Sequence, residues 1–573
     1  MASSVEMSSG AYEQGSKGLK GGALGLLSSV VIGVSSTAPG YSLAATLGLV
    51  AAAVSFQTPV IMVLAFVPMF FIAYAYRELN RVTPDCGTTF TWAAKAFGPR
   101  VGWMGGWGII AADIIVMASL SQIAGKYGFL MFGADDLANN RFWVTFVGCV
   151  WIAALTYVCY RGIEVSAIFQ FVMLSIEVVV LIIFSVVALL KVYTNNAPEG
   201  SVKPSLSWFN PLKIVNDSGS FDFSAFSGAI LLAVFIYWGW DSAVSVNEET
   251  RDPATTPGRA AVLSTVILLA TYAVVAVAAM SFAGPQALAD NSDDVFSAIG
   301  SQVLGSGFDK VLIFAVLTSA AASTQTTILP TARTTLSMAA YQALPASFAK
   351  IHPRYFTPTT STIAMGGLSI AFYVTLAAIS DNILGDSASA VGLLIAFYYG
   401  LTGFTSVWFF RNDRGSGIKD LTVRIILPLL GGLMLFGAFI KTVIDNADAA
   451  NSYTEINLFG WHTGGIFVLS VGSLLLGVVL MYVTQWRSPA YFTGTVLNRD
   501  TPVRVFEDES IRVLAPTLPD APSLEQTVVP PMSIEDLREA AAEGREDRAE
   551  ERAEERAEER EEPHPDPDKA PDA

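Results

Sequence analysis

Two long apolar stretches of this chain are interrupted by residues that break a helix. The first interruption is Ser35–Gly40, which includes Pro39, and the second is Tyr237–Asp241, which includes Gly239. Inside a bilayer every backbone N–H and C=O must find a partner within the protein, so a broken helix survives only where protein or a cavity surrounds it. Breaks in corresponding segments of two halves indicate the central binding site of a transporter. A packed proline kink is the alternative for the first break.

The composition places most of the chain in a membrane. Of its 573 residues, 52% are hydrophobic and 15% are charged, whereas a soluble domain carries about 25% charge. Apolar runs of about 20 residues recur, which is the length that crosses a bilayer. They predict an all-α integral membrane protein with twelve transmembrane helices in residues 22–485, between an N-terminal segment, 1–21, and a tail, 486–573. The spans lie near 22–52, 58–79, 101–130, 142–160, 166–192, 224–248, 260–283, 308–333, 359–380, 387–410, 422–443 and 464–485.

Charge predicts the orientation and the character of the tail. The loops on the side of the N-terminus hold about twice as many Lys and Arg as the other loops, which predicts that both termini are cytoplasmic in an inner or plasma membrane. Residues 486–573 hold 11 Lys and Arg against 23 Asp and Glu, so most of the net charge of −16 belongs to the tail. An Ala-Glu-Glu-Arg repeat in 534–562 is typical of a solvated single helix. We expect a tail without activity of its own; a helix that docks a partner is the alternative.

The first break predicts an anion site. Ala38 precedes proline and is disfavoured in the helical region, and Pro39 lacks an N–H group. Gly40 tolerates unusual backbone angles. The half-helix that begins near Tyr41 would then expose free N–H groups and the positive end of its dipole, where a substrate carboxylate is stabilised.

The second break predicts an amine site. Tyr237 and Trp238 offer aromatic faces, which attract an ammonium group. Asp241 falls near the middle of the bilayer, where an ionisable residue is costly and usually faces a cavity or a partner. The alternatives are that the aromatic rings only pack and that Asp241 caps the next half-helix.

Further polar residues inside the predicted spans suggest coupling and gating. Asp113 and Glu177 are acids within apolar runs, and such acids suit proton coupling or a structural hydrogen bond to a neighbouring helix. Glu248 and Glu249 are expected to pair with arginines as a gate or to lie in solvent. The eighth span carries hydroxyls that either bind a small cation such as Na⁺ or pack: Thr318, Ser319, Ser323, Thr324, Thr326 and Thr327.

No motif points to catalysis. The chain has no phosphate loop, no HExxH, no GxSxG and no Cys/His cluster with metal-ligand spacing. We therefore expect neither an enzyme nor a cofactor, a metal centre or a nucleic-acid partner.

Several ordered motifs resemble the amino acid–polyamine–organocation superfamily of secondary transporters. Pro84–Trp92 is similar to its P-D-A-G-G-x-Y-x-W loop, and Trp238–Pro253 is similar to its sixth-helix signature of Gly, aromatic, Asp, two Glu and Pro. Arg333, Leu344-Pro345, Phe348–Lys350 and Thr357-Pro358 resemble the segment after its eighth helix. The resemblance covers about residues 20–485.

The resemblance implies a LeuT-type fold, which is a five-plus-five inverted repeat with two extra helices that works by alternating access. It also implies that the first break holds the carboxylate of the substrate and the sixth helix its amino group. The carboxylate-side residues would be Ser36, Thr37, Ala38 and Gly40, and the amine-side residues Tyr237, Trp238 and Gly239, with Asp241 beside them. Two positions depart from the family pattern: Ser35–Gly40 replaces its Gly-x-Gly, and Glu177 stands where many relatives have a lysine.

The sequence thus predicts a secondary active transporter that imports an amino acid, with proton coupling. Glu177 and Asp113 are the candidates for the coupling proton. A carrier or exchanger of a polyamine or another cationic amine is the alternative within transport. A nutrient sensor that kept the transporter fold and signals through its tail is the alternative of another class.

Overall fold

The computed structural model of the chain describes residues 17–292, 295–305, 309–380, 382–412, 417–458 and 460–501. The chain divides into two units, Met1–Pro516 and Thr517–Ala573. The predicted repeat in 534–562 and most of the predicted N-terminal segment lie outside the described residues.

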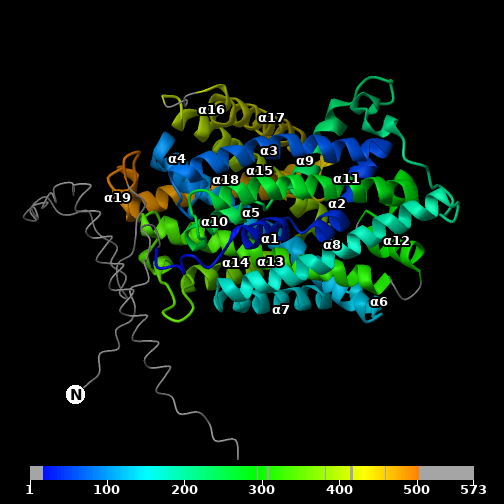
Figure 1. Ribbon diagram of the computed structural model, residues 1–573, viewed down its shortest axis with the longest axis horizontal. Coiled ribbons are helices and arrows are strands. Elements are labelled where there is room, and N and C mark those ends of the chain that lie inside the picture. The colour runs from blue at the N-terminus through cyan, green and yellow to red at the C-terminus, as the bar shows by residue number, and fades with distance from the viewer. Residues whose placement is uncertain are drawn as a thin grey trace, which may run out of the picture. The chain divides into compact units, whose positions relative to one another are not determined.

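The first unit is a bundle of long helices that run roughly side by side (Figure 1). Its helices are α1 (Leu26–Thr37), α2 (Pro39–Val54), α3 (Thr58–Val82), α4 (Thr89–Phe97), α5 (Pro99–Met131), α6 (Asp135–Ala138), α7 (Arg141–Tyr160), α8 (Ile163–Tyr193), α9 (Phe223–Ile236), α10 (Ser242–Ser245), α11 (Thr256–Asp290), α12 (Val295–Leu304), α13 (Asp309–Ala340), α14 (Thr359–Ile379), α15 (Ile383–Phe409), α16 (Ile418–Leu421), α17 (Leu427–Asn446), α18 (Gly465–Arg487) and α19 (Pro489–Phe492). The strands of the described residues, β1 (Glu455–Leu458) and β2 (Trp461–Gly464), form one antiparallel hairpin.

Within the described residues, ten helical stretches are long and apolar enough to cross a membrane, which confirms the prediction of a helical integral membrane protein. One of them, Leu26–Val82, covers the second predicted span and all but the first four residues of the first, and the predicted span 224–248 falls mainly on α9 and α10. The count of twelve spans and the inverted repeat stay predictions.

Burial separates inner helices from outer helices. In the most apolar window of α5, 89% of the residues are buried, and for the stretch within α13 the share is 83%. The corresponding share is 28% for α7 and for α18, whose exposed apolar side chains suit contact with lipid. Helices α1 and α2 pack against α11, α13 and α9, so both interrupted segments belong to the interior of the bundle.

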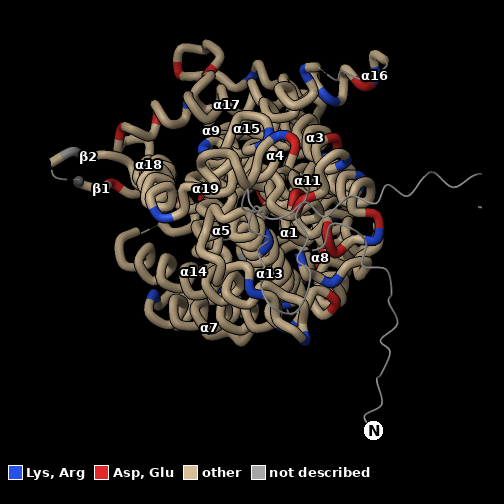
Figure 2. Tube along the Cα trace, turned by 90° about the vertical axis from the view of Figure 1, so that its left-hand side faces the viewer, with Lys and Arg blue, Asp and Glu red and all other residues tan. Residues whose placement is uncertain are grey.

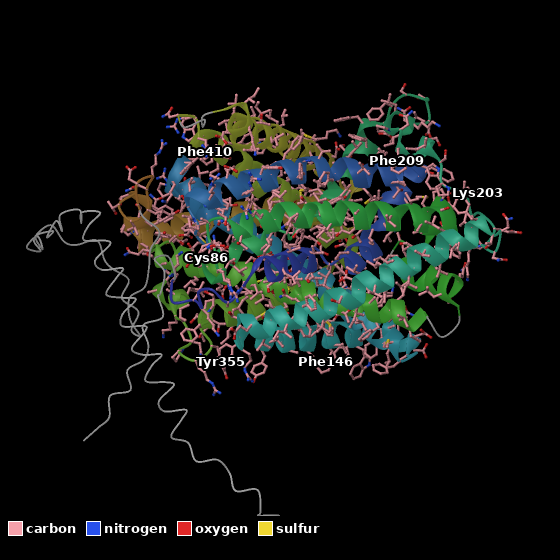
Figure 3. The ribbon with its side chains drawn as sticks, in the orientation of Figure 1. Cys86, Phe146, Lys203, Phe209, Tyr355 and Phe410 are labelled. Atoms are coloured by element: carbon pink, nitrogen blue, oxygen red, sulfur yellow. The ribbon has the colours of Figure 1, made fainter. Side chains whose placement is uncertain are left out.

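The bundle has two distinct ends. Cys86 and Lys203, which the loop charges predict on opposite sides of the membrane, lie at opposite ends (Figure 3). Figure 2 views the bundle from the end at which α4 and α19 lie, where charged residues surround the helix termini. The chain after α18 packs onto this end: Tyr491 is buried against Phe90, and Lys95 donates a hydrogen bond to the carbonyl of Thr501. Residues 489–501, within the predicted tail, are therefore part of the folded unit.

Candidate functional site

The first break lies where the sequence predicts it. Helix α1 ends at Thr37, Ala38 has a left-handed backbone with φ 45° and ψ 69°, and α2 begins at Pro39. The proline ring disfavours right-handed helical angles at the residue before it, and proline has no N–H to continue the ladder. All residues from 33 to 50 are buried. The break is therefore enclosed by protein.

The free N–H groups at the start of α2 have partners within the protein. The amide of Gly40 donates to Oε1 of Glu177 at 2.5 Å, and the amide of Tyr41 donates to Oγ of Ser319 at 3.0 Å. The hydroxyl of Ser319 in turn donates to the same Oε1 of Glu177 at 2.9 Å. The next amide, that of Ser42, donates to the carbonyl of Ala38. Side chains from α8 and α13 thus occupy the donors that the sequence assigned to a substrate carboxylate.

The second break touches the first. Helix α9 ends at Ile236 and α10 begins at Ser242, with Gly239 between them at φ 117°. The hydroxyls of Ser36 and Ser242 form a hydrogen bond of 2.8 Å, and the hydroxyl of Ser323 donates to the carbonyl of Ser36 at 2.9 Å. A Cβ atom on Gly239 would lie 2.8 Å from the carbonyl carbon of Ser36. Only a glycine allows this approach, because it tolerates the backbone angle and has no side chain.

The side chains of the second break point to α15. The indole N–H of Trp238 donates to the hydroxyl of Tyr398. The carboxylate of Asp241 accepts hydrogen bonds from Tyr399 at 2.9 Å and from Tyr398 at 3.2 Å. The alternative prediction that Asp241 caps the next half-helix is wrong: its side chain makes no capping hydrogen bond to α10. The two tyrosine hydroxyls hold it instead.

The predicted site residues are only partly brought together. Ser36, Gly40 and Gly239 lie at the contact between the breaks, whereas the hydroxyl of Thr37 donates to the carbonyl of Val34 in its own helix. The hydroxyl of Tyr237 is buried without a hydrogen-bond partner among the described residues. Its ring packs edge-on against that of Tyr272 at 5.0 Å.

Three buried acids have no cation beside them in the part of the chain that the structure describes. Asp113, Glu177 and Asp241 are 2%, 0% and 4% exposed. Asp113 accepts a hydrogen bond from the hydroxyl of Thr331 on α13. Across the described part of the chain none of the three forms an ion pair. Burial without a counter-ion is costly, so these acids are expected to serve a ligand or a proton.

The structure adds residues that the sequence did not single out. Tyr398 and Tyr399 form an adjacent pair in the predicted span 387–410, and two hydroxyls inside an apolar run were the available signal. Five of the six hydroxyl residues named in the eighth span divide into two groups. Ser319 and Ser323 reach the first break, whereas Thr318, Thr324 and Thr326 donate to carbonyls of α13 itself.

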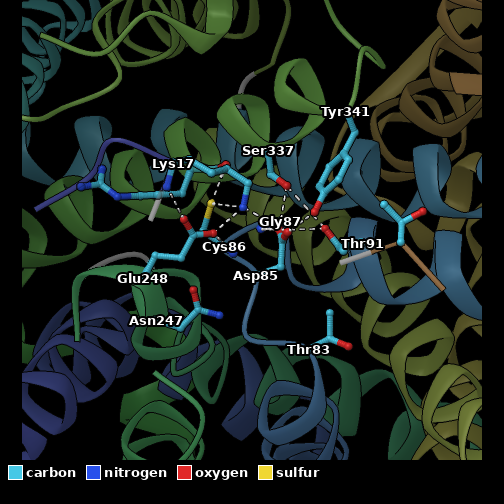
Figure 4. A network of polar contacts seen from close by, with 12 residues as sticks. Lys17, Thr83, Asp85, Cys86, Gly87, Thr91, Asn247, Glu248, Ser337 and Tyr341 are labelled. Carbon is cyan, nitrogen blue, oxygen red and sulfur yellow. Dashed lines mark hydrogen bonds and ion pairs between the residues drawn. The ribbon is translucent and has the colours of Figure 1, made fainter. Parts of the chain in front are cut away.

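A second polar network closes the end of the bundle at which α4 lies (Figure 4). The ammonium of Lys17 forms ion pairs with Asp85, at 3.0 Å, and with Glu248. The amides of Lys17 and Cys86 each donate to Glu248 at 3.0 Å. Ligand atoms of Asp85, Cys86 and Glu248 lie within 4.8 Å of one another, as a metal site would require. Because Lys17 already supplies a cation between the carboxylates, this is an ion-pair cluster rather than a metal centre.

Both partners of the Lys17–Asp85 pair are held in their charged forms. Burial opposes the charge of Asp85, but the ammonium of Lys17 and hydrogen bonds from Gly87 and Ser337 lower the pKa of Asp85 to about 2. Burial likewise opposes the charge of Lys17, and the coulombic attraction of Asp85 and Glu248 raises its pKa well above 10.5. The pair therefore stays ionised throughout the physiological range. A depressed carboxyl pKa stabilises the fold at pH above the unfolded value, and this contribution is lost only as the pH falls through about 2.

Glu249 completes this closed end. Arg333 donates to its two carboxylate oxygens, each at 2.9 Å, and both side chains are buried. The predicted pairing with arginine is thus confirmed for Glu249, whereas Glu248 pairs with a lysine. The backbone of Leu24 accepts from Arg251 and donates to the carbonyl of Glu249. The segment before α1 is therefore tied to the segment that follows the second break.

Comparisons with known proteins agree with this architecture. A family model described as "Amino acid permease" matches residues 24–468. The chain is 29% identical to an uncharacterized transporter of Mycobacterium tuberculosis over 409 residues. This aligned region covers 71% of this chain and 83% of the relative. It is 24% identical over 417 residues to the low-affinity putrescine importer PlaP of Escherichia coli, with coverage of 72% and 86%. It is 22% identical over 379 residues to the branched-chain amino acid permease BcaP of Lactococcus lactis, with coverage of 63% and 77%.

Proposed function

The chain belongs to the amino acid permease family, and from this premise we propose that it is a secondary active transporter that imports an organic amine by alternating access. The contact between the two breaks carries the proposal. Ser36 and Ser242 join two interrupted helices whose backbone polar groups and acids are enclosed together. Such a place suits a small polar solute that must be held at membrane depth and then released.

The shared chemistry of the relatives supports an amine as the substrate. One relative is named for putrescine and another for branched-chain amino acids, and both kinds of molecule carry an ammonium group. In this proposal Tyr237, Trp238 and Gly239 surround that group and Asp241 supplies a negative charge. Carbonyls at a helix break and a carboxylate both accept hydrogen bonds from an ammonium, which has three donors.

Proton coupling and orientation belong to the same proposal. Asp113 and Glu177 are the acids proposed to carry the proton, because neither has a cation beside it among the described residues.

We place the protein in the plasma membrane with both termini in the cytoplasm, following the distribution of Lys and Arg. The Lys17 cluster and the Glu249–Arg333 pair would then close the cytoplasmic side.

Counterflow in proteoliposomes tests the function. We expect labelled substrate to accumulate in vesicles preloaded with the same unlabelled compound, with separate pools for neutral, acidic and basic amino acids and for putrescine. Flux with any of these pools supports a carrier. Absence of flux with all of them, from protein that is folded and inserted, would contradict the proposal and favour a sensor.

Trp238→Ala is expected to weaken the affinity for the substrate roughly tenfold, because an aromatic face contributes up to about 2 kcal/mol to binding a desolvated cation. The change also removes the indole that donates to Tyr398. Equilibrium binding of radiolabelled substrate measures the effect. Trp143→Ala is the control, since Trp143 lies on α7 and is 43% exposed. Equal affinities of the two variants would return Trp238 to a packing role.

A further inference from the structure

The start of α2 already holds a carboxyl group, and that group belongs to the protein. Oε1 of Glu177 accepts from the amide of Gly40 and from the hydroxyl of Ser319. A carboxylate that receives a backbone N–H at the first turn of a helix, near the positive end of the helix dipole, is bound in the way that a ligand carboxylate would be. Glu177 reaches this place from α8, 137 residues along the chain from Gly40.

No amide in the first turn of α2 is left for a second carboxylate. Pro39 has no N–H, and the amides of Gly40, Tyr41 and Ser42 have partners. A Cβ atom on Gly40 would lie 3.4 Å from Oε1 of Glu177, so the carboxylate is packed against the backbone at the break. An incoming substrate carboxylate would find the amide of Gly40 occupied, and opposite an ionised Glu177 it would meet a like charge, a juxtaposition that costs several kcal/mol of affinity.

Both acceptors and donors around the breaks lack a partner among the described residues, and the donors include the indole N–H of Trp240. Oε2 of Glu177 is buried and has no hydrogen-bond partner among the described residues, and the same is true of the hydroxyls of Ser35 and Tyr237. Asp241, beside the second break, is held by hydroxyls alone in the described structure. A buried carboxyl group with a free oxygen and no counter-ion is neutralised either by a proton or by a cation that donates hydrogen bonds, and the second case would make it a recognition group for an amine.

We propose that Glu177 is a built-in substitute for the carboxylate of the substrate, so that this carrier takes an aliphatic diamine and rejects compounds with an α-carboxylate. One ammonium of the diamine binds the free oxygen of Glu177, and Asp241 receives the other. This inference rests on the proposed function and narrows its substrate class. It adds substrate recognition to the role that is proposed above for Glu177.

A matched pair of amines tests the proposal on the full-length protein. Putrescine and ornithine share the same diamine skeleton and differ by one carboxylate, so their affinities compare the absence and presence of that group directly. We expect putrescine to bind the wild type about 100-fold more tightly than ornithine, as a like-charge contact of several kcal/mol implies. Competition against radiolabelled putrescine in detergent measures the ratio.

Substitution of Glu177 then tests whether this side chain causes the preference for putrescine over ornithine. Glu177→Ala is expected to lose putrescine affinity and to gain ornithine affinity, because the amide of Gly40 becomes free for the carboxylate of ornithine. Added propionate is expected to restore putrescine binding to Glu177→Ala and to leave the wild type unchanged. Glu177→Gln preserves size and an acceptor but removes the charge, and it should lower putrescine affinity about tenfold. Glu164→Ala on the same helix is the control, since Glu164 is exposed and pairs only with Lys20 among the described residues.

Each outcome has a meaning. Wild-type affinity for ornithine equal to that for putrescine would overturn the substitute-carboxylate proposal and leave the carrier intact. Putrescine affinity unchanged in Glu177→Gln and in Glu177→Ala would overturn it as well. If Glu177→Ala does not fold, the proposal is still tested by the ratio of the putrescine and ornithine affinities of the wild type and by the putrescine affinity of Glu177→Gln. Binding of neither amine, nor of any amino acid, would instead contradict the proposed function.

Discussion

Gly239→Ala is expected to abolish substrate binding while the protein still folds and inserts. Gly239 has φ 117°, and a Cβ atom there would lie 2.8 Å from both the carbonyl carbon and the hydroxyl oxygen of Ser36. Alanine at such an angle costs about 1–3 kcal/mol in strain alone. The overlap with the backbone of Ser36 adds to this cost, because backbone cannot swing aside as the end of a side chain can. The two breaks must therefore separate, and the binding place between them is lost.

Gly228→Ala is the matched control for this experiment. Gly228 lies in α9, the helix that leads into the second break, and a Cβ atom there has no neighbour within 4 Å. Radiolabelled substrate binding to purified protein, with size-exclusion chromatography as the measure of folding, compares the two variants. Wild-type affinity in Gly239→Ala would show that the contact of the breaks has no part in binding.

Lys17→Ala is expected to open the end of the bundle at which α4 lies. The substitution leaves Asp85 and Glu248 buried together without their ammonium. Removal of one partner of a buried ion pair costs about 3–5 kcal/mol, which shifts an equilibrium between closed and open forms by a factor of roughly 100 or more. We expect faster hydrogen exchange at the amides of Leu24 and Arg251, which pair across this end in the closed form.

Lys20→Ala separates this effect from a general loss of positive charge. Lys20 is three residues further along and pairs with Glu164 at 2.8 Å, but both side chains are about half exposed. An exposed pair contributes about 0–1 kcal/mol, so exchange should stay near the wild-type rate. Equal protection of these amides from hydrogen exchange in Lys17→Ala and Lys20→Ala would show that the ion pairs of Lys17 do not hold this end closed. Mass spectrometry after deuterium labelling of protein in nanodiscs provides the measurement.

The sequence is sufficient to predict a structural feature when the cause of that feature is local. Pro39 and the residue before it determine the first break, whatever surrounds them, and the structure ends α1 and begins α2 at that point. The acids in apolar runs could also be predicted to be buried, because Asp113 and Glu177 have only apolar neighbours along the chain. Both are enclosed in the structure.

The partners of these groups could not be predicted, because they come from distant segments. Gly40 and Glu177 are 137 residues apart, and Lys17 and Glu248 are 231 apart. The alternative interpretation of Asp241 as a helix cap was wrong for the same reason. The carboxylate of Asp241 accepts hydrogen bonds from the hydroxyls of Tyr398 and Tyr399 on α15 instead of from the backbone at the start of α10. The packing of α15 against this segment brings the two hydroxyls within reach. A pattern along one helix contains no information about which neighbour faces it.

The chain also carries its own reporter of the proposed opening at the end of the bundle at which α4 lies. The thiol of Cys86 is fully buried beside Lys17, and burial there raises its pKa well above the ordinary value. A neutral thiol without solvent access does not react with maleimides or other alkylating reagents. When the ion pairs of Lys17 break, the sulfur of Cys86 becomes accessible to water. The buried environment that keeps the thiol neutral is then lost. The rate of alkylation of Cys86, measured separately from that of the partly exposed Cys149, therefore reports how often this end of the protein opens.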